Sequence, residues 1–332
     1  MTIHTLWGII ATKDLSESGG FLYNEKIKEA YIATLPIGSQ PRIRRRFESI
    51  VSAEQNVGKD IVEFNKEELR QWIGRFNWVS TDAVRSCIAD LSRYNRWAHD
   101  TNQGFQFTDA IETIDARKDI EYTKGISTSL LSSPDELVSK VLRVYPMNEG
   151  YEVWPTLIFA WLGFTPSEVV QIKSEAVDYA RHRVFMPDGM IYPYPIPDCF
   201  WEPLAAYAQT KDSERVAGSI RKVFADDLGF FLKKMLTQNS KQAGKPFVAG
   251  AIFDSVTRFS LLYEERFHEH IGFTYQTIMQ SGRYYRLYQA ELSGVDLYAK
   301  DNKDLVLELG KGKMVKDVLT IYEAYRKAFY PR

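Results

Sequence analysis

The chain has little of several residue classes, and each shortage excludes a class of protein. Only two cysteines, Cys87 and Cys199, occur in 332 residues, which excludes a disulfide scaffold or a cysteine-rich zinc site. We expect both to be buried free thiols. No apolar run approaches the roughly 20 residues that a membrane-spanning helix needs, and the N-terminus lacks the pattern of a secretory signal. These absences predict a cytoplasmic protein with no membrane partner.

An excess of charge of one sign is also missing, since the formal net charge is -1. Non-specific affinity for nucleic acid comes from cations that neutralise phosphates, so any DNA binding must use a local basic surface. The five histidines have no metal-binding spacing, because His268 and His270 would point apart on a helix. No glycine-rich phosphate loop occurs. We predict no metal and no cofactor.

Helical periodicity dominates what is present. Residues 66–76 and 80–100 each predict an amphipathic helix, the second with Ser80 as N-cap. A β-hairpin is predicted at 176–196, and residues 16–20 predict a turn. Further helices are predicted at 24–35, 134–145, 152–162, 198–208, 252–267, 274–292, 303–309 and 315–329. The predicted fold class is therefore mainly α with a small β-sheet.

One short segment suggests a family. Residues 163–168 read Gly-Phe-Thr-Pro-Ser-Glu, after an apolar helix and before Val-Val-Gln-Ile. This resembles the Gly-Leu-Arg-x-x-Glu turn in the active site of tyrosine recombinases and phage integrases, with Thr165 at the position of a catalytic arginine. Threonine carries no charge and no planar fork, so it cannot replace that arginine. Pro166 favours an extended Thr165 that begins a helix as N-cap, which is the structural alternative.

A second match lies near the C-terminus, where the family has His-x-Leu-Arg-His followed about a dozen residues later by glycine. Counting back from Gly294 places Arg283 at the arginine and Gln280 at the first histidine. Arg283 could bind a DNA phosphate or pair with Glu291 or Asp296.

Two further family positions differ or are ambiguous. Leu-Gly-Lys ending at Lys311 resembles Leu-Gly-His, and Tyr322 resembles the nucleophile, with Tyr325 as the fallback. An aromatic in such a helix is more often packing than chemistry. The turn 187–190, where the family carries a lysine, has none. The resemblance thus implies a member whose catalytic residues are degenerate and which is not an enzyme.

The resemblance covers about residues 42–325 and implies a two-domain architecture. Residues 1–40 would be an N-terminal extension whose role the sequence does not reveal. Residues 41–120 would be a helical, SAM-like core-binding domain, and 130–332 a catalytic-like domain. The segment that connects the two domains is expected within residues 102–133.

The candidate DNA-binding residues are basic side chains in local groups. One group opens a helix, a second occupies about a quarter turn of the helix 80–100, a third enters the hairpin, and a fourth surrounds the degenerate site. For each, a solvated or ion-paired surface is the alternative. The candidates are Arg42, Arg44, Arg45, Arg46, Arg85, Arg93, Arg96, Arg181, Arg183, Arg283, Arg286 and Lys311.

The family resemblance implies a function as well as a fold. The chain is similar to recombinase-like master repressors of SPβ-type prophages, which implies a sequence-specific transcriptional repressor of phage lysogeny. It would bind double-stranded operator DNA in the bacterial cytoplasm, in association with the nucleoid. One alternative is a divergent active recombinase that uses Tyr322 and Arg283. Another is an interaction module that binds a regulatory protein or itself.

Overall fold

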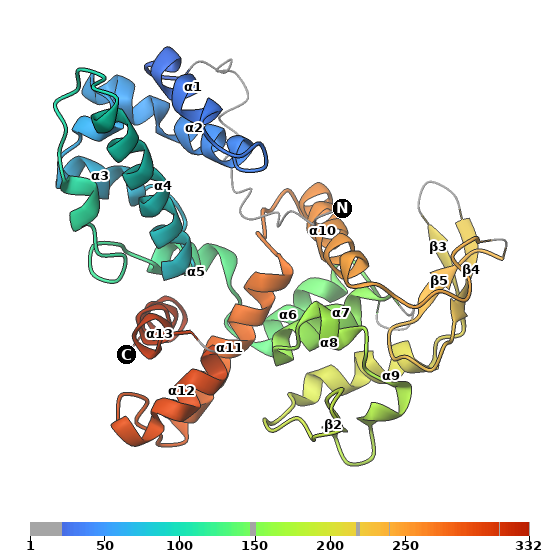
Figure 1. Ribbon diagram of the computed structural model, residues 1–332. Helices are drawn as coiled ribbons and strands as arrows, with labels where there is room; N and C mark the ends of the chain where they lie inside the picture. Colours follow the sequence, from blue (N-terminus) through green and yellow to red (C-terminus); the bar gives the residue numbers. More distant parts are fainter. Residues whose placement is uncertain (1–21, 147–150, 217–219, 239, 312, 332) are drawn as a thin grey trace. The chain divides into compact units, whose positions relative to one another are not determined.

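The computed structural model describes residues 22–146, 151–216, 220–238, 240–311 and 313–331, with the backbone alone for 213–216, 220 and 221. The turn predicted at 16–20 lies outside these residues. The chain divides into two compact units (Figure 1). We call the part up to Ile126, together with the chain from Lys316 onward, the N-terminal unit, and Ser127–Val315 the C-terminal unit.

The N-terminal unit is helical. Its α-helices are α1 (Glu25–Ala33), α2 (Gln40–Val57), α3 (Lys66–Ile73), α4 (Thr81–Asp100), the first residues of α5 (Thr123–Ser129) and α13 (Val315–Phe329), with short 3-10 turns η2 (Ile61–Glu63) and η3 (Ala110–Thr113). Side-chain caps set the starts of α3 and α4. Asn65 and Glu68 form a capping box before α3, and the Ser80 hydroxyl accepts the amide of Asp82 before α4.

Aromatic rings from three helices form the centre of this unit. Tyr31 of α1 lies 5.3 Å from Tyr94 of α4, ring centre to ring centre, and Phe47 of α2 lies 4.8 Å from Tyr94. All three rings are buried, and such pairs stabilise a core beyond the area that they bury. Because α1 supplies one of these rings, residues 25–33 are part of the unit and not an appendage to it.

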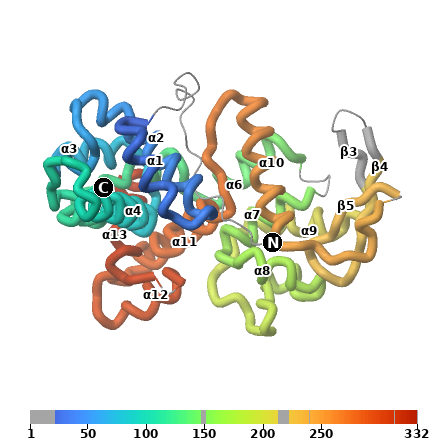
Figure 2. Tube along the Cα trace, turned by 45° about the horizontal axis from the view of Figure 1, so that its top comes forward, coloured from blue at the N-terminus to red at the C-terminus, as the bar shows by residue number. Residues whose placement is uncertain are grey.

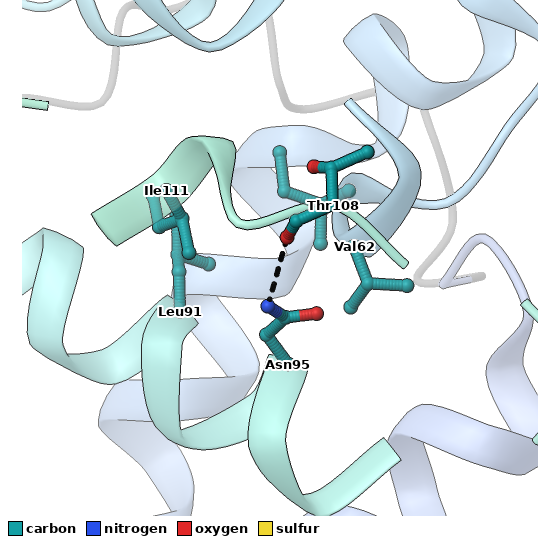
Figure 3. A pocket seen from close by; sticks show the side chains of 6 residues that line it. Val62, Leu91, Asn95, Thr108 and Ile111 are labelled. Atoms are coloured by element: carbon teal, nitrogen blue, oxygen red, sulfur yellow. Dashed lines mark hydrogen bonds between the residues drawn. The ribbon is translucent and has the colours of Figure 1, made fainter. Parts of the chain in front are cut away.

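The segment that follows α4 folds back onto it. Asn95 of α4 donates to the carbonyl of Thr108 at 3.2 Å, as Figure 3 shows. The crevice beside this bond, lined also by Leu91 and Ile111, measures about 10 Å³. That is about the space that one water molecule needs, so the crevice is a packing defect and not a ligand site.

The C-terminal unit combines helices with two small antiparallel sheets. Its helices are α6 (Pro134–Leu142), α7 (Val153–Leu162), α8 (Pro166–Val169), α9 (Trp201–Gln209), α10 (Ala249–Phe267), α11 (Tyr275–Leu292) and α12 (Lys303–Gly310), with 3-10 turns η5 (Ser174–Ala176), η6 (Asp198–Phe200) and η7 (Lys300–Asn302). The strands are β1 (Val177–Asp178), β2 (Arg183–Val184), β3 (Asp212–Val216), β4 (Ile220–Asp226) and β5 (Lys234–Leu236).

Helix α7 is the centre of the C-terminal unit. Every residue from Val153 to Leu162 is buried, as expected for a helix that is apolar all round. Helices α9, α10 and α11 pack against it. Figures 1 and 2 agree in placing β3–β5 next to α9, at one end of the unit.

The prediction of a mainly α fold with a small β-sheet is confirmed, and the predicted helices are present with ends that differ by a few residues. The sheet β3–β4–β5 was not predicted. Helix α13 also groups with the N-terminal unit, whereas the sequence placed it in a domain spanning 130–332. The cause is a set of contacts from α13 to α4 and to the chain before α5, described below.

No helix among the described residues is both long enough and apolar enough to span a lipid bilayer.

Candidate nucleic-acid interface

The turn after α7 uses Thr165 for structure. Gly163 ends α7 in the left-handed region at φ 91°, a conformation that glycine adopts without strain. Thr165 then caps α8: its hydroxyl accepts the amide of Glu168 at 3.3 Å, and its own amide donates to the Glu168 carboxylate at 2.5 Å. The N-cap interpretation of Thr165 is confirmed.

Cationic side chains from two later helices reach this turn. Arg286 of α11 donates to the carbonyl of Trp161 at 2.7 Å, and Lys311, just after α12, donates to the carbonyl of Gly163. These carbonyls lie at the C-terminal end of α7, where the helix dipole attracts positive charge. With Arg283 of α11, these side chains form what we call the cation cluster.

Arg283 is the most deeply buried member of the cluster. It is 3% exposed, and its buried Nη1 has no hydrogen-bond partner among the described residues. The alternative to a phosphate role, an ion pair of Arg283 with Glu291 or Asp296, is not among the ion pairs of the described residues. Gln280, one turn earlier on the same face of α11, also has a buried side-chain oxygen without a partner there. An unpaired buried guanidinium is costly unless an anion reaches it.

Burial and neighbouring charge lower the pKa of two members of the cluster, Arg286 and Lys311. Burial lowers the pKa of Arg286, and the neighbouring charge of Arg283 lowers it further. Burial also lowers the pKa of Lys311, which Glu168 opposes and the two arginines reinforce. Glu168 is the nearby carboxylate, 4.0 Å from the Lys311 ammonium. The cluster therefore has excess positive charge.

A glycine allows α11 to approach the end of α7. A Cβ built on Gly282 would lie 1.9 Å from the carbonyl oxygen of Trp161, so no other residue fits without moving a helix. This close contact brings Arg283 and Arg286 to the turn. Spacing alone predicts Arg283, whereas only the packing of α11 on α7 explains the glycine beside it.

The hairpin candidates lie on the surface of the C-terminal unit. Arg181 pairs with Asp178 at 3.2 Å and is 73% exposed, and Arg183 is exposed on β2. The turn 187–190 is exposed and carries no lysine.

The candidate nucleophile belongs to the other unit. Tyr322 lies in α13, is 0% exposed and groups with the N-terminal unit, as does the equally buried Tyr325. The cation cluster belongs to the C-terminal unit. Tyr322 and the cation cluster are thus assigned to different compact units.

One carboxylate organises part of the N-terminal arginine group. Asp90 of α4, with a side chain 2% exposed, pairs with Arg42 of α2 and, at 3.2 Å, with Arg93 of α4. Arg42 and Arg93 remain 48% and 62% exposed. Two cations on one buried carboxylate leave a net positive surface spanning α2 and α4. The sequence indicated the arginines but not this shared anchor.

The other N-terminal candidates differ in how they are paired. Arg44 pairs with Glu29 at 2.5 Å, and Arg96 lies 3.9 Å from Glu112 and is 71% exposed. Arg45 is exposed, and the Nε of Arg46 is buried without a partner among the described residues. Arg85 is held by Asp317 of α13.

Part of the chain matches a known protein family. Residues 22–100 match the family described as MrpR, N-terminal core-binding domain. The N-terminal unit carries an MrpR-type core-binding domain. The match begins before residue 41, so the stretch 22–40 belongs to the domain, in agreement with the packing of α1.

A relative of nearly equal extent is also known. The chain is 24% identical over 279 residues to the SPbeta prophage-derived uncharacterized protein YopR of Bacillus subtilis (strain 168), covering 81% of this chain and 82% of YopR. The predicted resemblance to an SPβ-type prophage protein is confirmed, as is the predicted core-binding domain.

Integrase structures align along most of the chain. The Tn1549 transposon integrase in complex with a circular intermediate DNA has 12% identity and a TM-score of 0.38, covering 90% of this chain and 94% of its own. The integrase from mycobacterium phage Brujita has 13% identity and a TM-score of 0.31, with coverages of 93% and 92%.

Proposed function

We propose that the protein is a sequence-specific DNA-binding repressor of phage lysogeny, built on a recombinase-like fold that has lost strand transfer. The observation that carries the proposal is Arg283, 3% exposed with a guanidinium nitrogen that has no partner among the described residues. A buried arginine in this state is complementary to an anion, and phosphate oxygens match its planar fork. A DNA backbone phosphate is the anion that we assign to it.

The N-terminal unit would supply further contacts. Its core-binding domain presents Arg42 and Arg93 on the shared anchor Asp90, with Arg96 largely exposed on the same helix as Arg93. Phosphate contacts of this kind set the register on the duplex, while base-edge contacts in the major groove provide specificity.

Several features support the loss of chemistry. Attack by a tyrosine needs cations to stabilise the charge that develops on the phosphate, and removing one such donor costs about 3–4 kcal/mol in enzymes. Here Thr165 is engaged as a helix cap, Gln280 stands for a histidine, and the turn 187–190 offers no lysine. Tyr322 is fully buried. Arg286 and Lys311 supply cations for binding, and Lys311 stands where the family has a histidine.

The first experiment is a footprint of the purified protein on fragments of phage and host genome, followed by denaturation to look for covalent adducts. We expect a specific footprint that denaturation reverses completely. A covalent adduct that Tyr322→Phe abolishes would make the protein an active recombinase. Absence of any footprint would favour an interaction module.

A matched pair of variants then tests the phosphate assignment. Arg283→Met should weaken operator binding about 10-fold or more, as the loss of one charge-assisted bond predicts, and should reduce the salt slope by about one phosphate. Arg258→Met removes the same charge from an exposed position on α10 and should leave both quantities near wild type. Equal effects of the two variants would contradict the assignment of Arg283.

A further inference from the structure

A carboxylate of the last helix holds an arginine of the core-binding domain. Asp317 of α13 accepts from Nη1 of Arg85 at 2.7 Å and from Nη2 at 2.5 Å. Both terminal nitrogens of the guanidinium are therefore engaged by one carboxylate, the bidentate geometry that is strongest for this pair of groups. The pair joins residues 232 positions apart within the N-terminal unit.

The contact lies at the edge of a buried surface. The side chain of Asp317 is 6% exposed and that of Arg85 is 37% exposed. Arg117 approaches the same carboxylate at 4.0 Å. The hydrogen bonds that Asp317 accepts from Arg85 raise the pKa of this arginine above its usual range. One buried carboxylate thus faces positive charge from α4 and from the chain that precedes α5.

The rest of α13 explains why the carboxylate is held there. Its buried residues recur at helical spacing and form one apolar face, while Lys327 on the outer side lies 3.8 Å from Glu121. Near its end, Tyr325 packs on Phe329 with ring centres 5.0 Å apart. The apolar face consists of Val318, Ile321, Tyr322 and Tyr325.

Arg85 lies on the strip of α4 that carries other DNA-binding candidates. At 100° per residue, Arg96 falls about 20° from Arg85 around the helix. Arg96 is 71% exposed and only loosely paired, whereas Arg85 has no free terminal nitrogen. On this strip, Arg96 is available to bind DNA, whereas Arg85 is engaged by Asp317 of α13.

We propose that α13 is an autoinhibitory helix, in which Asp317 occupies the place of a DNA phosphate on Arg85. A phosphate and the Asp317 carboxylate need the same two nitrogens of Arg85, Nη1 and Nη2, so binding of one excludes the other. Release of α13 would free Arg85 for the duplex, and any event that stabilises the docked helix would weaken DNA binding. This inference rests on the proposed DNA-binding function.

The test removes the carboxylate's charge and keeps its shape. Asp317→Asn in the full chain should tighten binding of the footprinted DNA about 3- to 10-fold and steepen the dependence of affinity on salt by about one phosphate. Asp304→Asn, which removes the same charge from an exposed position on α12, is the matched control and should change neither. In the Asp317→Asn background, Arg85→Ala should abolish the gain.

A measurement on the wild-type chain needs no variant. If DNA displaces the helix, amide hydrogen exchange in residues 315–329 should accelerate when the protein is saturated with DNA. Unchanged exchange there, or unchanged affinity in a folded Asp317→Asn protein, would overturn the inference while a wild-type footprint kept the proposed function intact. Absence of any wild-type footprint would instead remove the proposed function itself.

Discussion

Buried charges occur in both units, but their partners differ. In the N-terminal unit, the Lys28 ammonium donates to both oxygens of Glu54 at 2.6 and 2.5 Å and lies 3.8 Å from Asp60, with all three side chains 0% exposed. In the C-terminal unit, Arg283 is almost equally buried, yet Nη1 has no partner among the described residues.

The remaining bonds of the first network make the difference sharper. Glu54 also accepts the amide of Ile61 at 2.9 Å, and Asp60 accepts from Tyr94 at 3.3 Å and from Asn24 at 3.1 Å. Burial nonetheless raises the pKa of Glu54 to about 7, although Lys28 opposes the shift. A closed network of this kind specifies a core. The cation cluster, in which Nη1 of Arg283 has no partner among the described residues, instead indicates a binding site for an anion.

The largest expected effect is on the closed network. Lys28→Met leaves Glu54 and Asp60 buried without their cation, which should cost about 3–5 kcal/mol of unfolding free energy. Denaturant unfolding measures this cost. Lys26→Met, on the exposed side of α1, should cost little. A small loss in Lys28→Met would contradict a structural role for the network.

The next effect concerns the packing that positions the cation cluster. Gly282→Ala would force a methyl group to within 1.9 Å of the Trp161 carbonyl, and overpacking of this kind costs about 1–3 kcal/mol. Thermal unfolding should show a lower Tm. A Cβ at Gly250 of α10 meets nothing within 4 Å, so Gly250→Ala is the control. If both variants melt together, the close contact of α7 and α11 is not required.

Removal of a buried cation from the cation cluster should not destabilise the protein, in contrast to removal of Lys28. Arg283→Met removes a buried charge that the described chain does not neutralise, so the unfolding free energy without DNA should stay within about 1 kcal/mol of wild type or rise. Chemical denaturation measures this directly. A loss as large as that of Lys28→Met would show that Arg283 is structural and would remove the contrast between the units.

The smallest effect is a pH dependence of binding. Because the pKa of Lys311 is lowered, its protonated form, which attracts phosphate, is present below that pKa and is lost as pH rises through it. DNA affinity should therefore fall at a pH below that of an ordinary lysine, by about 1 kcal/mol or roughly fivefold. Lys311→Arg keeps its charge and should remove this fall. An identical pH profile for both proteins would exclude Lys311 from binding.

The sequence predicted the helices well because their signals are local. The N-caps Ser80 and Thr165 and the apolar repeat of α4 depend on neighbours in the chain. The sheet β3–β5 was missed because its strands carry mixed charges and its stability depends on pairing across the sheet. The domain assignment of α13 was missed for a similar reason, since its partner Arg85 is distant in sequence.

For the site, spacing predicted a binding role for Arg283 and placed Thr165 at the family's arginine position, because both belong to motifs that stay contiguous in the chain. It did not predict that Arg286 binds the carbonyl of Trp161 or that Asp90 gathers Arg42 and Arg93. Those contacts join separate helices, and many pairings are compatible with the same residues until the helices pack.

The sequence by itself therefore determined which segments are helical and where their caps lie. Only the tertiary structure decided which charges are paired: Lys28 by two carboxylates, Arg85 by Asp317, and Arg283 by none among the described residues. The physical reason is range. Caps and periodicity act within one or two helical turns, whereas the cost of a buried charge depends on every group that folding brings around it.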